Sequence, residues 1–324
     1  MSPSTKPAIR KQRGVALITA ILMVALATIL AVDIAYRGYL DQRRTMTTLA
    51  LDQSYQLALG AEAWAADTLA QDYKDNPKVT SFAQKWATPI PPIPVDGGEI
   101  QGQLEDMGGR FNLNNLAETD PKKRDAYIKQ FKNLLAILQL EPEWADKLVD
   151  WIDSDSNPTY PDGGEDDAYS SLQPPYLTAN VTITRVSELL ALKGFGLERF
   201  RRLEPFVSAL PPGTPINLCT APGAVLDSFG SALRQFSLDA KFLARQRTSA
   251  CFPEPKDLQT ALSASSEEES KRVADPKIAS TTSNNFRATI VVTLGSFEFT
   301  LYSHLLRSPT GDSTAAVFRS FGTD

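Results

Sequence analysis

The first strong pattern in the chain is an uninterrupted apolar stretch near its beginning. Residues 15–32 are eighteen consecutive positions without a charge, a glycine or a proline. At a rise of about 1.5 Å per residue, a helix of this length reaches about 27 Å, close to the hydrocarbon thickness of a bilayer. The residues before it carry four basic side chains and no acidic one, and such segments stay on the cytoplasmic side. The pattern predicts one membrane-spanning helix over 15–36, with the remainder of the chain exported.

Helical spacing of apolar residues continues beyond this stretch. Tyr55, Ala58, Leu59, Ala65 and Leu69 keep that spacing, and no proline interrupts the chain between them. We therefore expect the membrane helix to continue as a stalk into the soluble part of the protein.

The pattern then alternates between strand-like and helical segments. An extended proline-rich connector over 89–94 precedes a predicted strand over 99–106, and the asparagine-rich turn over 108–116 is expected to leave the sheet. Helical periodicity follows from about 118 to 210. Strand patterns return at 286–294 and 297–302, where Gly295-Ser296 predicts a hairpin.

Strands on both sides of a helical block favour an insertion over two domains in series. The predicted fold class is α+β: a long N-terminal helix packed on an antiparallel sheet, with a large inserted all-α domain. The predicted segments are a basic leader over 1–14, a membrane helix over 15–36, the stalk helix and first part of the sheet domain over 37–117, the α-helical insert over 118–210, and the rest of the sheet domain over 211–324, with a mobile polar loop near 263–285.

Charge and cysteine content narrow the functional class. The formal net charge is −5, and removing the four positive charges of residues 1–14 leaves −9, so nucleic acid is not the expected partner. The only two cysteines, Cys219 and Cys251, are expected to form a disulfide in an oxidising compartment. Two unpaired thiols are the alternative.

The densest chemical signal is an acidic loop. Residues 141–167 contain ten acidic side chains and one basic one. The spacing of Asp153, Asp155 and Asn157 is typical of a calcium loop, and Gly163-Gly164 allow the following residues to fold back onto it. The predicted calcium ligands are Asp153, Asp155, Asn157, Glu165, Asp166 and Asp167. A solvated acidic loop without a cation is the alternative, and Mg²⁺ fits less well because it requires fewer ligands in a stricter geometry.

An enzymatic function has little support in the sequence. His304 is the only histidine and lies in a predicted strand, which leaves no partner for a Ser/His or Cys/His arrangement. The acidic loop contains carboxylates that could act as an acid/base pair, but their crowding suits a cation better. We expect no catalytic residues.

A second alternative is a membrane-tethered DNA receptor. The Gly-x-Gly turn over 192–197 resembles a helix-hairpin-helix, and Arg199, Arg201 and Arg202 follow it. The competing interpretation is a packing turn between two helices.

The leader boundary resembles that of the type IV pilin and pseudopilin superfamily, because Gly14 separates a basic leader from an apolar helix. The resemblance implies that a prepilin peptidase cuts after Gly14 and methylates the new N-terminus at Val15. An uncleaved signal anchor is the alternative. Most pilins carry Glu at the fifth mature position, where this chain has Thr19. Without that carboxylate a neighbour's buried ammonium would stay unpaired, so a place at a filament tip follows as a hypothesis.

Several further motifs are similar to those of the protein K family of type II secretion systems, the large minor pseudopilins. They lie at residues 58–64, 109–116, 150–158, 164–167 and 186–189. The resemblance implies a pilin-like fold with an inserted α-helical domain, a calcium site on the acidic loop, and a tip complex with minor pseudopilins I and J. It also implies anchoring in the inner membrane with the bulk of the chain in the periplasm, and a role in exporting folded proteins across the outer membrane.

Overall fold

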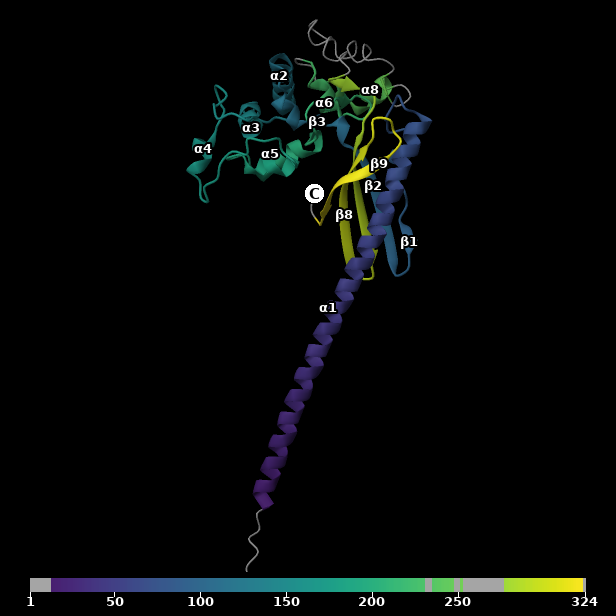
Figure 1. Ribbon diagram of the computed structural model, residues 1–324, viewed down its shortest axis with the longest axis vertical. Coiled ribbons are helices and arrows are strands. Elements are labelled where there is room, and N and C mark those ends of the chain that lie inside the picture. The colour runs from purple at the N-terminus through teal and green to yellow at the C-terminus, as the bar shows by residue number, and fades with distance from the viewer. Residues whose placement is uncertain (1–12, 231–234, 248–250, 253–276, 323–324) are drawn as a thin grey trace, which may run out of the picture.

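One helix forms the spine of the molecule. The computed structural model describes residues 13–230, 235–247, 251–252 and 277–322. Helix α1 (Arg13–Asp75) is a single helix of 63 residues whose first half projects from the rest of the protein (Figure 1). This half is long and apolar enough to cross a membrane, and its apolar side chains are exposed. The continuous helix predicted from the spacing is therefore present, whereas most of the predicted leader lies outside the described residues.

The second half of α1 packs on one face of a five-stranded antiparallel sheet. The strands, in the spatial order β1-β2-β7-β8-β9, are β1 (Ile93–Val95), β2 (Gly98–Asp106), β7 (Asn285–Leu294), β8 (Phe297–Arg307) and β9 (Thr314–Phe321). Ala58 and Leu69 of α1 are fully buried against Val292 and Leu301 of the sheet. Burial of these apolar faces is the main force that holds the spine to the sheet.

The predicted hairpin joins β7 to β8. Gly295 has a φ of +58°, a conformation that glycine adopts at little steric cost. The strands run longer than their alternating pattern indicated, and β1 and β9 were not predicted. The fold class predicted from the sequence is confirmed.

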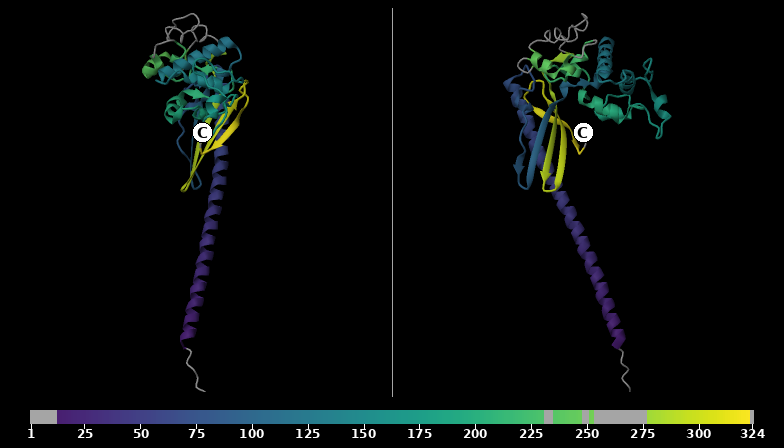
Figure 2. Two further views of the ribbon diagram at one scale, coloured as in Figure 1. Left: turned by 90° about the vertical axis from the view of Figure 1, so that its left-hand side faces the viewer. Right: turned by 180° about the vertical axis from the view of Figure 1, so that it is seen from behind.

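A large insert leaves the sheet at the end of β2 and returns at the start of β7. These strands are hydrogen-bonded neighbours, and Asp106 lies opposite Phe286. In Figures 1 and 2 the insert lies beside the sheet, at the end away from the projecting half of α1. Its elements are η2 (Met107–Gly109), β3 (Phe111–Asn112), η3 (Leu113–Ala117), α2 (Pro121–Ile137), α3 (Trp144–Ile152), α4 (Asp166–Ser170), η4 (Val186–Ala191), α5 (Gly196–Leu203), η5 (Glu204–Phe206), β4 (Val207–Ser208), β5 (Ile216–Asn217), α6 (Gly223–Asp227), α7 (Gln235–Leu238), α8 (Ala240–Gln246) and β6 (Ala279–Ser280).

The insert has a hydrophobic core of its own. Phe111 stacks on Phe131 with ring centroids 5.3 Å apart, and both rings are buried. The asparagine-rich turn supports this core from within, because the Asn114 side chain donates to the carbonyls of Ile183 and Leu210 at 2.9 Å. Buried amide groups with such partners satisfy backbone groups that would otherwise be costly to bury.

The insert extends further along the chain than the predicted end at 210. Ile216, Leu218, Val225 and Ile278 belong to the same buried cluster, so the chain joins the sheet again only after about 284. Of the predicted mobile loop, residues 263–276 lie outside the described residues. The rest of it differs from the prediction, because Ala279–Ser280 pair with Ile216–Asn217 as parallel strands. Its serine and threonine side chains find protein partners; Thr281 Oγ1, for example, donates to the carbonyl of Lys78 at 2.8 Å.

Cys219 and Cys251 form a disulfide within the insert. Both residues are buried, and Cys219 follows directly after β5. The bond joins the parallel strand pair to the segment that follows α8.

Candidate metal centre

The acidic loop runs between α3 and α4 and is positioned by the end of α3. The apolar face of α3 buries Leu148, Trp151 and Ile152 in the core of the insert. Asp150 lies in the last turn of this helix, and Asp153 is the residue that caps its end. Residues three apart on a helix share a face, so the helix presents both carboxylates to the loop that follows.

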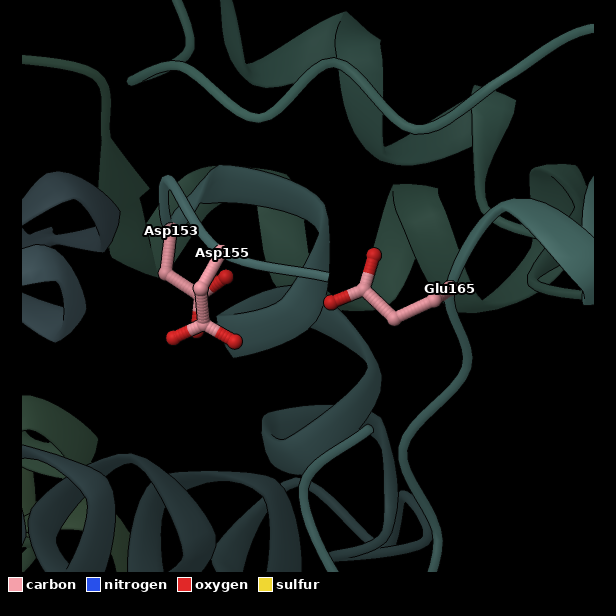
Figure 3. Close-up of side chains that lie close together, drawn as sticks. All are labelled: Asp153, Asp155 and Glu165. Atoms are coloured by element: carbon pink, nitrogen blue, oxygen red, sulfur yellow. The ribbon is translucent and has the colours of Figure 1, made fainter. Parts of the chain in front are cut away.

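Three carboxylates of this loop meet at one point. Asp153, Asp155 and Glu165 each offer an oxygen, and these oxygens lie within 4.8 Å of one another. Figure 3 shows the two aspartates on one segment and Glu165 reaching toward them from the opposite segment. We call these three residues the acidic triad.

Asp150 holds the loop in place through hydrogen bonds to its backbone. Its side chain is fully buried, and both of its carboxylate oxygens accept from the backbone N–H of Thr159 at 3.0 Å. Gly163 packs directly on it, since a Cβ at this position would lie 2.1 Å from Asp150 Oδ2. Only glycine therefore allows the returning segment to approach this closely. Asp150 lies in the acidic stretch that the sequence indicated but was not among the predicted ligands, although its spacing from Asp153 on a helix was a usable signal.

The triad is electrostatically strained without a counter-charge. Burial raises the pKa of Glu165 to about 7, and the charge of Asp150 adds to the effect. Burial likewise raises the pKa of Asp153 to about 6, with Asp155 and Asp150 contributing. Asp153 Oδ1 and Glu165 Oε1 are buried and have no hydrogen-bond partner within the described part of the chain. Buried oxygens of this kind need a donor or a cation, because leaving them unsatisfied is costly.

The donor set fits a hard divalent cation. Three carboxylates converge on one point, and two of their oxygens have no protein partner there. Ca²⁺ takes six to eight oxygen ligands in flexible geometry, with water completing the shell, whereas thiolate or imidazole donors are absent from the triad. The triad can therefore hold a metal ion.

The other predicted ligands lie outside the triad. Asn157 is exposed, and its side-chain amide donates to Asp155 Oδ1 at 3.0 Å, which orients that carboxylate. Asp166 Oδ1 accepts from Thr178 Oγ1 at 2.7 Å, and Asp167 is exposed. Thr178, which the sequence analysis did not predict, also donates to Glu165 Oε2 at 3.3 Å. It therefore fixes both acidic side chains at the start of α4.

The Gly-x-Gly turn before α5 packs within the insert. Gly194 and Gly196 have φ values of +80° and +76°, as a tight turn requires. The Arg199 guanidinium binds the Glu141 carboxylate at 2.7 Å and lies 5.3 Å from the Trp144 ring. One of the three arginines proposed for DNA is thus already neutralised by a carboxylate.

The remaining predicted positions lie apart from the triad. His304 Nε2 lies 3.1 Å from Asn285 Oδ1 on the sheet, and burial lowers the pKa of this imidazole. Gly14 and Val15 lie at the start of α1. The Thr19 hydroxyl donates to the Ala16 carbonyl at 3.0 Å, so it is satisfied within its own helix.

Comparison with known proteins identifies close relatives. A family described as "Type II secretion system (T2SS), protein K" matches residues 109–212. The type II secretion system protein K of Pseudomonas aeruginosa is 40% identical over 227 residues, which cover 67% of this chain and 68% of the relative. The protein K of Pectobacterium carotovorum is 37% identical over 210 residues, or 62% of this chain and 64% of that protein.

A solved structure shows the same architecture. The GspK-GspI-GspJ complex from the type 2 secretion system of enterotoxigenic Escherichia coli contains a chain that superposes with a TM-score of 0.76 at 25% identity. The match covers 87% of this chain and all of the other. The structural match therefore covers more of this chain than the sequence alignments with the relatives named above.

A long apolar helix, packed on an antiparallel sheet that carries a helical insert, defines a pseudopilin. Such proteins are structural subunits rather than enzymes, in line with the expectation from the sequence. Within this class, the chain belongs to the type II secretion system protein K family. Its N-terminal apolar helix is consistent with a membrane anchor.

Proposed function

We propose that this chain forms the tip of a short periplasmic pseudopilus together with the minor pseudopilins I and J of its own secretion system. In this position it supports the export of folded proteins across the outer membrane. After cleavage following Gly14 and methylation of Val15, the apolar half of α1 anchors it in the inner membrane and later packs among the helices of its partners. The mechanism is assembly rather than catalysis.

The position of the insert carries this proposal. It occupies the end of the molecule away from the membrane half of α1 and lies to one side of the sheet (Figure 1). A subunit placed above this one in a filament would have to clear the whole insert. A subunit of this shape therefore suits the last position, where nothing is stacked on it.

The start of α1 supports the same position. Residues 13–19 contain no acidic side chain, and the Thr19 hydroxyl donates within the helix. A subunit above would bring its N-terminal ammonium to this region of the apolar filament core, where an unpaired charge is costly.

Calcium at the acidic triad is the second part of the proposal. The cation would be held by Asp153, Asp155 and Glu165. Its positive charge would offset the burial that raises the pKa values of Asp153 and Glu165. Because the triad joins the end of α3 to the start of α4, a bound cation stabilises the insert rather than the spine.

Affinity purification from membranes tests the tip assignment. The full chain, solubilised in detergent, is expected to retain both minor pseudopilins I and J. A truncation that removes residues 15–36 is the control for the contribution of the membrane helices. Recovery of neither partner from a system in which all three are expressed would refute the assignment.

Native mass spectrometry of the same full chain tests the cation. We expect bound calcium that chelation removes, and loss of that calcium in Asp153→Asn and Glu165→Gln variants. Asp167→Asn is the matched control, because Asp167 is exposed and lies outside the triad. Calcium retained by both triad variants would place the cation elsewhere.

A further inference from the structure

Strand β9 is an unprotected edge of the main sheet. Within the described residues, β8 is the only strand that pairs with it. The opposite edge, β1, has three residues and contains Pro94, which is a common way to blunt a sheet edge. By contrast, β9 has eight residues without a lysine or proline, and its only charged side chain, Arg319, is bound to Glu62 of α1 at 2.8 Å. Edges of this kind readily accept a further strand.

The hydrogen-bonding pattern of β9 shows which groups face the free edge. The Gly322 N–H donates to the carbonyl of Thr300 on β8 at 3.1 Å, and the adjacent residues Leu301 and Phe321 lie opposite each other. Hydrogen-bonding direction alternates along an antiparallel pair. The N–H and C=O groups of Arg319 and Phe321 therefore point away from β8, toward the free edge. The register shift between His304 and Leu305 lies at the other half of β9 and leaves this half regular.

A groove adjoins this edge on the face of the sheet opposite α1. Its volume is about 550 Å³, and it lies between the insert and strands β7 to β9. Phe318 and Val317 of β9 line it and are 47% and 56% exposed. Sites of this size between domains, mostly apolar with a few polar groups, are typical of binding sites.

Three arginine side chains line this groove, and they differ in whether a carboxylate pairs with them. Arg110 and Arg287 both pair with Glu105 and Glu204. Arg185, just before η4, lies with its guanidinium 4.7 Å from the centre of the Phe318 ring. In the part of the chain that the structure describes, no carboxylate pairs with it. Arg185 therefore presents a positive charge beside the exposed edge residue.

We propose that the free edge of β9 binds an extended strand of a partner polypeptide that carries a carboxylate opposite Phe318, where it pairs with Arg185. The added strand bonds to the outward N–H and C=O groups of Arg319 and Phe321. A residue opposite Phe318 is then in a non-hydrogen-bonded pair, with Cβ atoms about 4.5–5.5 Å apart. A carboxylate at that point reaches the guanidinium above the Phe318 ring, so backbone pairing gives affinity and the charge fixes the register. The inference does not depend on the place at the tip, and its failure would leave that assignment untouched.

A charge-swap experiment on the full chain in detergent tests the proposal. The probes are two short peptides of alternating threonine and valine, one with a central glutamate and one with a central lysine. We expect the wild-type chain to bind the glutamate peptide about tenfold more tightly, and Arg185→Glu to reverse this preference. Arg201→Glu is the matched control, because Arg201 is exposed on α5 and does not line the groove.

Hydrogen exchange locates the binding. The glutamate peptide should slow exchange of the Arg319 and Phe321 amides and leave the amides of β1 unchanged. Equal binding of both peptides by wild type and Arg185→Glu would overturn the proposal, and so would protection confined to other segments. No binding of either peptide would overturn it as well. If β9 is instead protected in the absence of peptide and the protein is dimeric, the edge pairs with a second copy and the proposal of a separate partner fails.

Discussion

Replacing Glu165 with glutamine should stabilise the insert when calcium is absent. The folded protein raises the pKa of Glu165 to about 7, mainly by burial and then by the charge of Asp150. A carboxyl group whose folded pKa lies above its unfolded value favours folding only at low pH. That contribution is lost as the pH rises through 7, so at pH 8 the charged carboxylate opposes folding. Glutamine keeps the size of the side chain and removes the charge.

The size of the expected gain in the free energy of unfolding follows from the shift in the pKa of Glu165. The pKa rises from 4.5 to about 7, and each unit corresponds to about 1.4 kcal/mol, which sets an upper bound of about 3 kcal/mol. The observed gain should be smaller than this bound, because the titrations of neighbouring carboxylates in the loop are coupled. We therefore expect a gain of about 1–2 kcal/mol in the free energy of unfolding at pH 8 with chelator.

Urea unfolding of the full chain in detergent, followed by the near-UV signal of the insert, measures this gain. Trp151 reports directly on the packing of the insert, because the centres of its ring and of the Tyr169 ring lie 5.2 Å apart next to the loop. The gain should shrink below pH 6, where the wild-type carboxyl is protonated. With calcium in excess the order should reverse, since only the wild type gains binding energy, about 2.7 kcal/mol at a hundredfold excess over the dissociation constant. A Glu165→Gln variant less stable than the wild type in chelator would refute the reasoning, and Asp167→Asn should show neither effect.

Three further perturbations test other parts of the molecule. Thr19→Glu should lower secretion in cells that lack the wild-type chain, because it makes the tip subunit resemble the subunits beneath it; unchanged secretion counts against a role for Thr19. Reduction of the Cys219–Cys251 disulfide should lower the free energy of unfolding by about 3 kcal/mol, measured by urea unfolding with and without reductant, with Cys219→Ser as the comparison. Glu62→Gln should lower the free energy of unfolding by about 2 kcal/mol at pH 7. Burial alone would raise the pKa of Glu62, but its hydrogen bonds to Arg319 outweigh burial and lower that pKa. That difference should fade as the pH falls below about 4, where the wild-type carboxyl also becomes protonated; a constant difference across the acid range would contradict it.

The elements that the sequence predicted well are those whose signal is local. Helix α1 and the β7–β8 hairpin are defined by periodicity and by one glycine within the segment itself. Strand β9 was missed, because its Ala-Ala-Val start is a weak strand pattern and its position depends on pairing with β8. The end of the insert was placed too early for a related reason. The apolar residues from Ile216 onward join a core whose other members lie about a hundred residues earlier, at Phe111 and Phe131.

The candidate site was predictable in composition but not in geometry. Spacing indicated Asp153 and Asp155, and the glycine pair indicated that Glu165 would return to them. The contacts that decide which acidic residues point toward the triad cannot be read from the spacing of residues in the sequence. The bonds from Thr178 turn Asp166 away from the triad, and the buried Asp150 holds the turn that brings Glu165 back.

The insert is joined to the sheet at one buried polar junction at the end of β2. Asp106, the last residue of β2, accepts from the Gly108 N–H at 2.8 Å, from Asn217 Nδ2 at 2.7 Å and from Thr220 Oγ1 at 2.6 Å. Arg307 of β8 is also buried there, and its guanidinium donates to Thr80 Oγ1 at 3.0 Å. Displacing the insert would leave these buried groups unpaired, at a cost of about 1–3 kcal/mol for each. The orientation of the insert relative to the sheet is therefore held by buried groups that must stay together.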